Sequence, residues 1–263
     1  MSDAGHLLEV RNVRKQFGGV AALNGLDLHV DVGEIVSVIG PNGAGKSTMF
    51  NVITGLSEPD GGDVLFKGES IVGLLPHQIV RIGIARTFQN VKLFPNMTIL
   101  ENAMVGQHTR SRTGLVGAIV RPPSVRREEE KIRERARLAL RFFGTRLAGF
   151  REEQSAFVLS YANRRRLEMA RAIATEPTLL CLDEPTAGMN PRETLEMRDN
   201  IVRMREELGL TVIVIEHDMR VVKGVSDRVV ALDYGRKIAE GSYDEVANDE
   251  RVIEAYLGTK AVG

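Results

Sequence analysis

The chain has 263 residues, 43% of them hydrophobic, and its 35 Lys and Arg side chains balance 35 Asp and Glu. This length and apolar content suit one large α/β domain, or a core with a subdomain. A formal net charge of zero argues against nucleic acid as the main ligand, because basic surfaces are what attract nucleic acids. The single cysteine, Cys181, excludes an internal disulfide and fits a reducing cytoplasm.

Neither a leader nor a membrane span is expected from the sequence. Residues 1–5 lack a basic region followed by an apolar one. No apolar run approaches the roughly 18 residues that cross a bilayer. We therefore expect a cytoplasmic protein whose membrane role depends on a partner.

The first part of the chain, from Leu7 to about Phe66, predicts strands. Leu8–Val13 and Leu26–Val30 alternate between apolar and polar residues, which is typical of a partly exposed antiparallel sheet. Ile35–Ile39 is apolar almost throughout and predicts a buried central strand.

A glycine-rich segment, residues 40–48, follows this buried strand directly and reads GPNGAGKST. It fits the G-x-x-x-x-G-K-[ST] pattern of phosphate-binding loops, in which glycines allow a tight turn that points backbone N–H groups inward. A helix beginning at Lys46 adds its positive dipole end. We expect Lys46 to reach the β- and γ-phosphates and Ser47 to offer its hydroxyl to Mg²⁺. The sequence predicts an ATP site contacted by Gly40, Pro41, Asn42, Gly43, Ala44, Gly45, Lys46, Ser47 and Thr48.

The middle of the chain is expected to be helical. A first helix is predicted over Thr98–Gln107. Residues 106–123 are rich in Gly, Arg and Ser, and a second helix is predicted after them, with Ser124 as its cap. The charge run Arg126–Glu134 is interpreted as the solvated side of that helix.

In the last third of the chain, apolar strands alternate with helices, which predicts a parallel sheet covered on both faces. The expected strands are Leu179–Leu182, Thr211–Ile215 and Arg228–Leu232. Asp183 and Glu184 follow the first of these strands, where Asp183 suits a Mg²⁺ ligand and Glu184 a base that polarises water. His217 follows the second, at the edge where such sheets bind ligands.

Other polar residues receive simpler interpretations. The remaining histidines show no metal-ligand spacing and are expected to be surface or structural residues: His6, His29, His77 and His108. Cys181 is interpreted as a small core residue. The run Arg164–Arg166 is expected on a solvated helix face.

The segment Leu159–Asn163 reads LSYAN, and we name it the signature segment because it resembles the Leu-Ser-Gly-Gly-Gln signature of ATP-binding cassette ATPases. The resemblance covers nearly the whole chain. It implies a single ATP-binding domain over 1–263: a P-loop NTPase core with a mostly parallel sheet, an N-terminal antiparallel β subdomain and an inserted α-helical subdomain. The expected core is about 1–88 and 176–263, the helical subdomain about 89–175, and a short C-terminal helix spans 243–257.

The same resemblance implies individual roles. Phe17 matches the aromatic residue that stacks on adenine, and Gln89 matches the glutamine near Mg²⁺ that joins the core to the helical subdomain. Asp183 matches the metal carboxylate and Glu184 the general base. His217 matches the histidine that contacts the γ-phosphate.

The resemblance also implies contacts across a dimer. Ser160 and Ala162 would act on ATP held by the partner, and the loop Ala187–Asn190 would cross the interface. Ala162, Asn163 and Asn190 depart from the usual residues. Alanine keeps its backbone N–H and is strained, by roughly 1 kcal/mol or more, only where φ must be positive.

Several stretches resemble the LivG-type ATPases of branched-chain amino-acid importers: Asn96–Thr98, Glu101–His108, Pro122–Glu128 and Val252–Gly258. This implies an ATPase subunit, peripheral on the inner face of the membrane, for branched-chain or related amino acids. Its partners would be a second ATPase subunit, identical or different, permease subunits docked near Gln89, and indirectly an extracytoplasmic solute-binding protein.

Three other functions are compatible with parts of this sequence to different degrees. The same engine could serve another cargo, such as urea, other amides or a lipid. A cassette ATPase acting on DNA or ribosomes is disfavoured, because the chain has no sustained heptads between Lys46 and Asp183 and carries one cassette. A non-hydrolysing nucleotide sensor is disfavoured by the presence of Glu184 and His217.

Overall fold

The computed structural model describes residues 5–107 and 122–257. Its larger sheet has six strands in the order β10-β9-β3-β8-β7-β6. The strands from β9 to β6 pair in parallel, and the edge strand β10 is antiparallel to β9. The bounds are β3 (Ile35–Ile39), β6 (Ile84–Arg86), β7 (Leu179–Asp183), β8 (Thr211–Ile215), β9 (Arg228–Asp233) and β10 (Arg236–Gly241).

A second, antiparallel sheet has the order β2-β1-β4-β5, which confirms the predicted N-terminal antiparallel sheet. Its strands are β1 (Leu8–Phe17), β2 (Val20–Val30), β4 (Gly61–Phe66) and β5 (Glu69–Ser70). β1 and β2 are longer than predicted and pair from Leu8↔Val30 to Phe17↔Val20. Helix α1 lies between the two sheets, because Met49 and Phe50 belong to a core cluster that joins both sheets.

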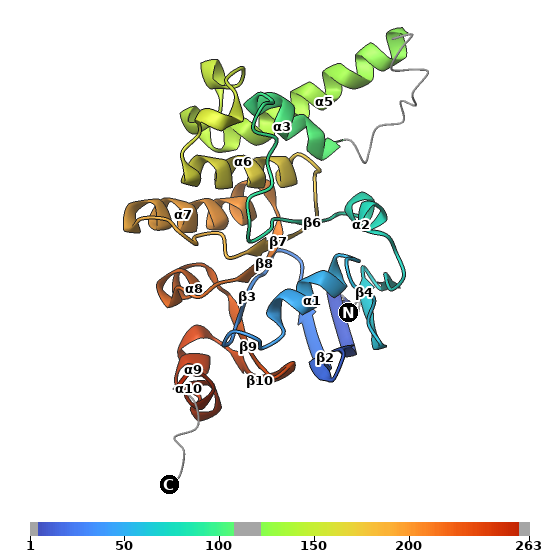
Figure 1. Cartoon of the computed structure of the whole chain (residues 1–263), viewed down its shortest axis with the longest axis vertical. Coiled ribbons are helices and arrows are strands. Elements are labelled where there is room, and N and C mark those ends of the chain that lie inside the picture. Colours follow the sequence, from blue (N-terminus) through green and yellow to red (C-terminus); the bar gives the residue numbers. More distant parts are fainter. Residues whose placement is uncertain (1–4, 108–121, 258–263) are drawn as a thin grey trace.

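Helices cover both faces of the larger sheet, drawn to its left and its right in Figure 1, and further helices lie beyond its β6 edge. Their bounds are α1 (Lys46–Ile53), α2 (Pro76–Ile82), α3 (Ile99–Val105), α5 (Pro123–Phe142), α6 (Tyr161–Ile173), α7 (Pro191–Leu208), α8 (Met219–Val225), α9 (Tyr243–Ala247) and α10 (Glu250–Leu257). Along β8, Val212 and Val214 pack toward α6 and α7, whereas Ile213 and Ile215 pack toward α1. The sheet is therefore buried on both faces, as predicted, and Cys181 is a buried core residue.

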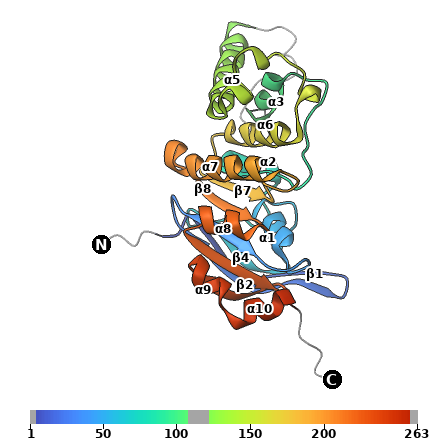
Figure 2. The same ribbon diagram turned by 90° about the vertical axis from the view of Figure 1, so that its left-hand side faces the viewer.

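Three helices, α3, α5 and α6, stack on the α7 side of the sheet (Figure 2). The predicted helix Thr98–Gln107 is confirmed as α3, with Thr98 and Glu101 forming its capping box. α5 begins at Pro123 and not after Ser124, because a proline fits the first helical position, where its missing N–H is not needed. The residues of Arg126–Glu134 are exposed or half-buried, as expected for a solvated side. Most of the predicted 106–123 stretch, including His108, lies outside the described residues.

The C-terminal helix predicted over 243–257 is two helices, α9 and α10. Asn248 ends α9, and its side-chain amide donates to the Asp244 carbonyl at 2.6 Å. Asp249 then accepts the Arg251 backbone N–H at 2.9 Å, which favours a new helix start.

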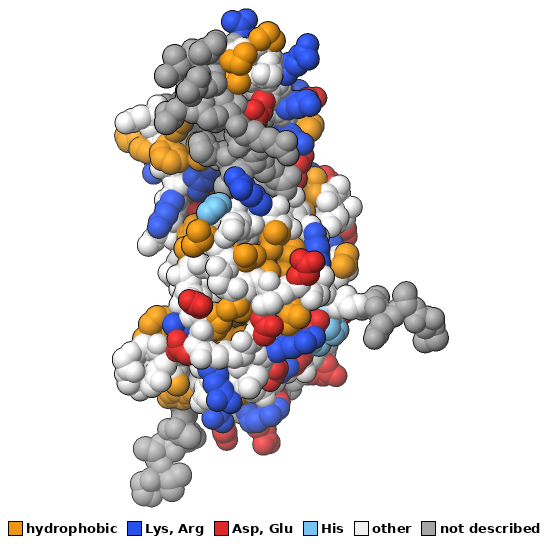
Figure 3. Space-filling view, turned by 90° about the vertical axis from the view of Figure 1, so that its right-hand side faces the viewer, with side chains coloured by type: hydrophobic (Ala, Val, Ile, Leu, Met, Phe, Trp, Pro, Cys, Tyr) orange, Lys and Arg blue, Asp and Glu red, His pale blue; other side chains and the backbone are white. Residues whose placement is uncertain are grey.

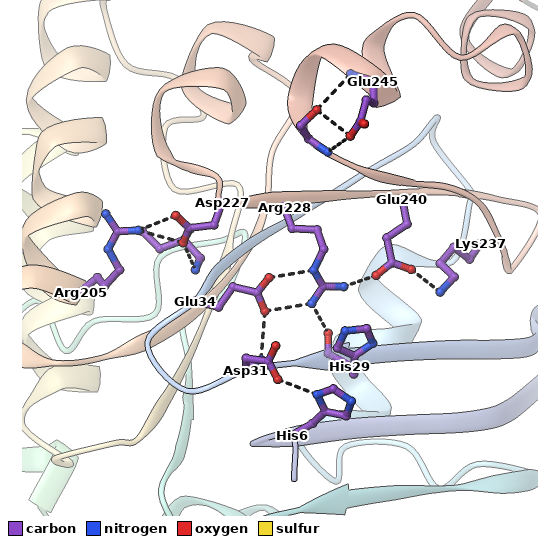
Figure 4. Close-up of polar contacts among 12 residues, drawn as sticks. His6, His29, Asp31, Glu34, Arg205, Asp227, Arg228, Lys237, Glu240 and Glu245 are labelled. Carbon is purple, nitrogen blue, oxygen red and sulfur yellow. Dashed lines mark hydrogen bonds and ion pairs between the residues drawn. The ribbon is translucent and has the colours of Figure 1, made fainter. Parts of the chain in front are cut away.

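A polar network ties the two sheets together (Figure 4). Arg228, at the start of β9, donates to Glu34 at 2.8 Å and to the His29 carbonyl on β2 at 2.8 Å. The ring of His6 lies 4.1 Å from that of His29 and bonds to Asp31 at 2.6 Å. Burial, assisted by Arg228, lowers the pKa of His29. His6 and His29 are therefore not scattered in space: with Asp31 they form a group whose possible ligand atoms all lie within 4.8 Å of one another.

On the face drawn in Figure 3, basic and acidic side chains are intermixed over the lower part of the molecule. This distribution matches the balanced composition. Among the described residues, no helix is long and apolar enough to cross a membrane.

Candidate active site

The phosphate loop, residues 40–48, turns from the end of β3 into α1 with three glycines at positive φ. A Cβ atom on Gly40 would lie 2.2 Å from the Leu232 carbonyl oxygen, and one on Gly45 would lie 2.4 Å from the Ala22 carbonyl oxygen. Both positions therefore require glycine, because neighbouring backbone approaches too closely for any side chain. The loop is fixed against both sheets and opens α1 at Lys46, as predicted.

The Lys46 ammonium lies in the concave side of this loop. Its side chain is buried, and Nζ donates to the carbonyls of Gly40 at 2.6 Å and Pro41 at 2.9 Å. Burial lowers the pKa of Lys46, and the nearby carboxylates of Glu184 and Asp183 oppose that shift. A phosphate group placed in the loop would offer this cation stronger, charged acceptors than two carbonyls.

A cavity of about 560 Å³ lies beside the phosphate loop. Its lining comes from the loop, from the start of β2, from the β9–β10 hairpin and from α10: Val20, Ala21, Pro41, Asn42, Gly43, Ala44, Asp233, Tyr234, Ile238, Arg251, Glu254 and Ala255. Phe17 pairs with Val20 across this turn, and half of its surface is exposed. Phe17 is therefore an exposed neighbour of one lining residue, but it does not itself line the cavity.

Asp183, the last residue of β7, is buried and accepts Arg86 Nη2 at 2.8 Å. Arg86, on the neighbouring strand β6, also donates to Asn51 of α1 at 2.7 Å. Its guanidinium carbon lies 5.2 Å from the ring centres of Phe50 and Phe88. The sequence analysis did not identify Arg86. Its position beside Asp183 depends on the pairing of β6 with β7, two strands that are far apart in the sequence.

Glu184 lies between the other two predicted catalytic residues. Its Oε2 accepts Gln89 Nε2 at 3.0 Å, and its Oε1 lies 3.0 Å from His217 Nε2. The three residues follow β6, β7 and β8, so adjacent parallel strands bring them to one edge of the sheet. Glu184 has φ of 46°, a conformation that strains a residue with a side chain and is typical of functional sites.

Glu216 is a buried support that sequence reasoning missed. Its carboxylate accepts the backbone N–H groups of Thr186 at 2.9 Å and His217 at 2.9 Å, as well as the Thr186 hydroxyl. It therefore holds the loop after β7 against the loop after β8. Between these loops lies a cavity of about 260 Å³ that Glu184 and His217 both line.

The signature segment lies apart from the phosphate loop, on the α6 layer of the molecule (Figure 1). Ser160 is the exposed N-cap of α6 and accepts the Asn163 N–H at 3.4 Å. Ala162 lies in the first turn of this helix, and the positive-φ residues of the described chain do not include it. The structure therefore shows no left-handed strain at Ala162.

The loop Ala187–Asn190 contacts the signature segment. A Cβ on Gly188 would lie 3.2 Å from the ring of Tyr161. Asn190 caps α7 by accepting the Glu193 N–H at 3.0 Å, a role in which asparagine and aspartate serve equally well. This capping explains how the loop tolerates asparagine there.

Arg165 and Glu168 of α6 hold the segment that carries Gln89. Arg165 donates to the Phe88 carbonyl at 2.6 Å and to the Gln89 carbonyl, and Glu168 accepts the Phe88 N–H at 3.3 Å. The prediction of a solvated face for Arg164–Arg166 is wrong: Arg165 is 1% exposed and Arg166 3%. α6 lies between the sheet and α5, so polar side chains on its inner faces, Arg165, Arg166 and Glu168, are buried, while Arg164 is half-buried.

Comparison with known proteins identifies the class. Residues 23–187 match the family model described as ABC transporter, and residues 236–262 match the one described as branched-chain amino acid ATP-binding cassette transporter. The chain belongs to the ABC transporter family and is one of its ATPases.

Its relatives narrow the comparison. The chain is 42% identical to the high-affinity branched-chain amino acid transport ATP-binding protein LivG of Escherichia coli (strain K12) over 96% of this chain and 98% of that one. It is equally identical to BraF of Pseudomonas aeruginosa, named for the same transport, with the same coverage.

Solved structures agree with the fold. A nucleotide-free ATP-binding cassette from an ABC transporter superposes with a TM-score of 0.83 at 31% identity, covering 97% of this chain and all of that one. A dimeric cassette bound to ADP and Pi, in a post-hydrolysis state, superposes with a TM-score of 0.74 at 28% identity, covering 90% and 98%.

Proposed function

We propose that this chain is the ATP-hydrolysing subunit of an importer for branched-chain amino acids. The observation that carries the catalytic part is Glu184, held within 3.0 Å of both Gln89 and His217 at the sheet edge that also presents the phosphate loop. The names of the relatives and the family model over residues 236–262 support the cargo. We also retain the division into a core, about 1–88 and 176–263, and a helical subdomain, about 89–175.

The residues have distinct roles in this proposal. Lys46 and the loop N–H groups bind the phosphates, and Phe17 stacks on the adenine. The oxygen donors of Ser47 and Asp183, together with Gln89, suit Mg²⁺, which supplies positive charge against the phosphates when bound. Glu184 accepts a proton from the attacking water.

In the hydrolysis step, the water oxygen bonds to the γ-phosphorus. The bond between the γ-phosphorus and the β–γ bridging oxygen breaks, and ADP and phosphate are formed. The imidazole of His217 holds the Glu184 carboxylate in place and faces the γ-phosphate. Gln89 bonds to the opposite oxygen of Glu184, so the carboxylate is fixed from both sides before the water is bound.

The complete site is formed by two subunits. Ser160 and the backbone N–H of Ala162 stand at the start of α6, where a helix terminus favours anions, yet they lie on another layer than the phosphate loop of the same chain. We propose that they contact ATP held by a second ATPase subunit, and the dimeric relative bound to ADP and Pi supports this arrangement.

The membrane partners follow from the importer assignment. Permease subunits dock near Gln89 and the helical layer, which places the chain on the inner face of the membrane, and a solute-binding protein delivers the cargo outside. Another cargo, such as urea, an amide or a lipid, remains the alternative, because this chain does not contact the cargo.

Uptake by cells tests the proposal. Cells lacking this chain should lose uptake of labelled leucine, isoleucine and valine, and the unmodified chain should restore it. The Lys46→Ala variant should not restore uptake, because it lacks the charge on the phosphates. Normal leucine uptake with lost urea uptake would overturn the cargo, and MgATP affinity unchanged in Lys46→Ala would overturn the nucleotide site.

A further inference from the structure

The C-terminal helix α10 contacts the first residue of the phosphate loop. The hydroxyl of Tyr256 accepts the backbone N–H of Gly40 at 2.8 Å, across 216 positions of sequence. The carbonyl of the same glycine accepts Lys46 Nζ at 2.6 Å. Both polar groups of Gly40 are therefore held by side chains, one from α10 and one from α1.

The position of Gly40 explains why this bond matters. Ile39, the preceding residue, pairs with Ala231 at the end of β3, and the chain leaves the sheet at Gly40. A backbone N–H at that point has lost its strand partner and needs another acceptor. Gly40 is also buried, and a Cβ atom at this position would lie only 2.2 Å from the Leu232 carbonyl oxygen. The start of the loop therefore has little room to shift.

The remainder of α10 is placed against the same region. Val252 is buried in a cluster that contains Ile39, the residue immediately before the loop, and Ala231, which pairs with Ile39 from β9. Arg251, Glu254 and Ala255 line the 560 Å³ cavity together with the phosphate loop. One helix therefore packs on the strand end, bonds to the loop start and forms a wall of the cavity.

We infer that Tyr256 is a positioning residue for nucleotide binding, and that α10 uses its hydroxyl to fix the start of the phosphate loop in the shape that receives phosphates. This inference rests on the proposed nucleotide site. Without the hydroxyl, the Gly40 N–H would bond to mobile water instead of a fixed acceptor. Nucleotide binding would then have to order the loop, and this ordering would reduce affinity. Because a neutral hydrogen bond is modest in net terms, we expect nucleotide affinity to fall by about threefold to tenfold.

The Tyr256→Phe variant removes the hydroxyl and keeps the ring. Titration calorimetry of the full chain with MgATP and MgADP should show the threefold to tenfold loss for both nucleotides, while the thermal unfolding midpoint should fall only slightly because one neutral hydrogen bond is lost. Backbone amide exchange at Gly40, measured by NMR without nucleotide, should become faster. In the transporter, KM for ATP should rise while kcat stays near its original value.

A matched control is Tyr243→Phe, which removes a hydroxyl from the neighbouring helix α9, where the ring faces Lys223. It should leave affinity and Gly40 exchange unchanged. Equal affinity and equal Gly40 exchange in Tyr256→Phe and the unmodified chain would overturn the inference. Failure of the unmodified chain to bind MgATP would instead overturn the proposed function, so the two failures are distinguishable.

Discussion

Single residues at this site carry conformations that their types would normally avoid. Glu184 has a left-handed backbone, and its carboxylate is held from two sides. Strain of this kind persists only where surrounding structure enforces it, and here the buried Glu216 fixes the adjoining loops. In the proposed mechanism, this fixed carboxylate takes a proton from water without reorganising.

Replacing Glu184 by Gln separates nucleotide binding from chemistry. The amide keeps the shape of the side chain but has lost the basic oxygen, so ATP should still bind and hydrolysis should fall by about 10² or more. Turnover of the assembled transporter and calorimetry of the isolated chain measure the two effects. Near-normal turnover would show that Glu184 is not the base.

Cys181 offers a second test at the residue scale. Burial between the β7 neighbours raises the pKa of its thiol to about 12, so the reactive thiolate is absent at pH 8. We expect no alkylation by iodoacetamide in the folded chain and full alkylation in denaturant, as followed by mass spectrometry. Alkylation of the native chain at a rate typical of a solvent-exposed thiol would show that β7 is not buried in the interior of the sheet.

At the scale of elements, α6 contacts two parts of the proposed site. Its N-terminus presents Ser160, and between one and a little over two turns later Arg165 and Glu168 hold the backbone of Phe88 and Gln89. A shift of the Gln89 backbone would therefore disturb side chains of the same helix that begins at the signature segment. Burial raises the pKa of Glu168, which shows that this pairing is placed in a desolvated interior.

Arg165→Met should expose the role of this pair. Removing one partner leaves Glu168 buried without its cation, which destabilises a protein by about 3 to 5 kcal/mol. The double variant Arg165→Met, Glu168→Leu should recover most of that stability in chemical denaturation, yet turn over ATP slowly because the Gln89 segment is no longer held. Arg166→Met, whose parent side chain bonds to Glu196, is the control for a buried arginine that does not touch this segment.

The signature segment itself is tested by two small changes. Ala162→Gly should leave turnover equal or slightly lower, because alanine is unstrained in the first turn of α6 and glycine adds flexibility.

Ser160→Ala should spare ATP binding by the isolated chain and impair hydrolysis by the assembled transporter. If Ser160→Ala abolished binding by the monomer, the contact in trans would be wrong; increased turnover in Ala162→Gly would indicate strain there.

At the scale of the whole molecule, the two sheets meet through the Arg228 network, and we expect this junction to be weakened by acid. The pKa of His29 is lowered by burial, so the unfolded chain binds a proton more readily than the folded one. The resulting stability is present above the ordinary His pKa of 6.5 and is lost as pH falls through the lowered value. Asp31, whose pKa is lowered by His6, acts in the same direction at lower pH.

We therefore expect the urea midpoint to fall between pH 7.5 and pH 5, and to fall less in His29→Gln. Comparing the two chains at each pH isolates His29, because other titrating groups such as Glu168 are common to both. An identical pH dependence in both chains would show that this histidine is not a source of acid sensitivity.

Sequence alone predicted the parts of this protein that depend on neighbouring residues. The glycines of the phosphate loop and the apolar strands before Asp183 and His217 are local patterns, because turns and strand burial are decided within a few positions. The family resemblance added the site residues and the signature segment. Helix boundaries were predicted less accurately. α5 begins at Pro123 and not after Ser124, and the predicted C-terminal helix is interrupted at Asn248.

Only the tertiary structure decided which distant side chains meet. Arg86 reaches Asp183 because β6 pairs with β7, and Tyr256 reaches Gly40 because α10 packs beside β3. Arg165 is buried because α6 lies between the sheet and α5, although its sequence neighbourhood is strongly charged. These contacts depend on strand order and layer packing, which no short stretch of sequence contains, and burial by a neighbouring layer overrides what a polar run predicts.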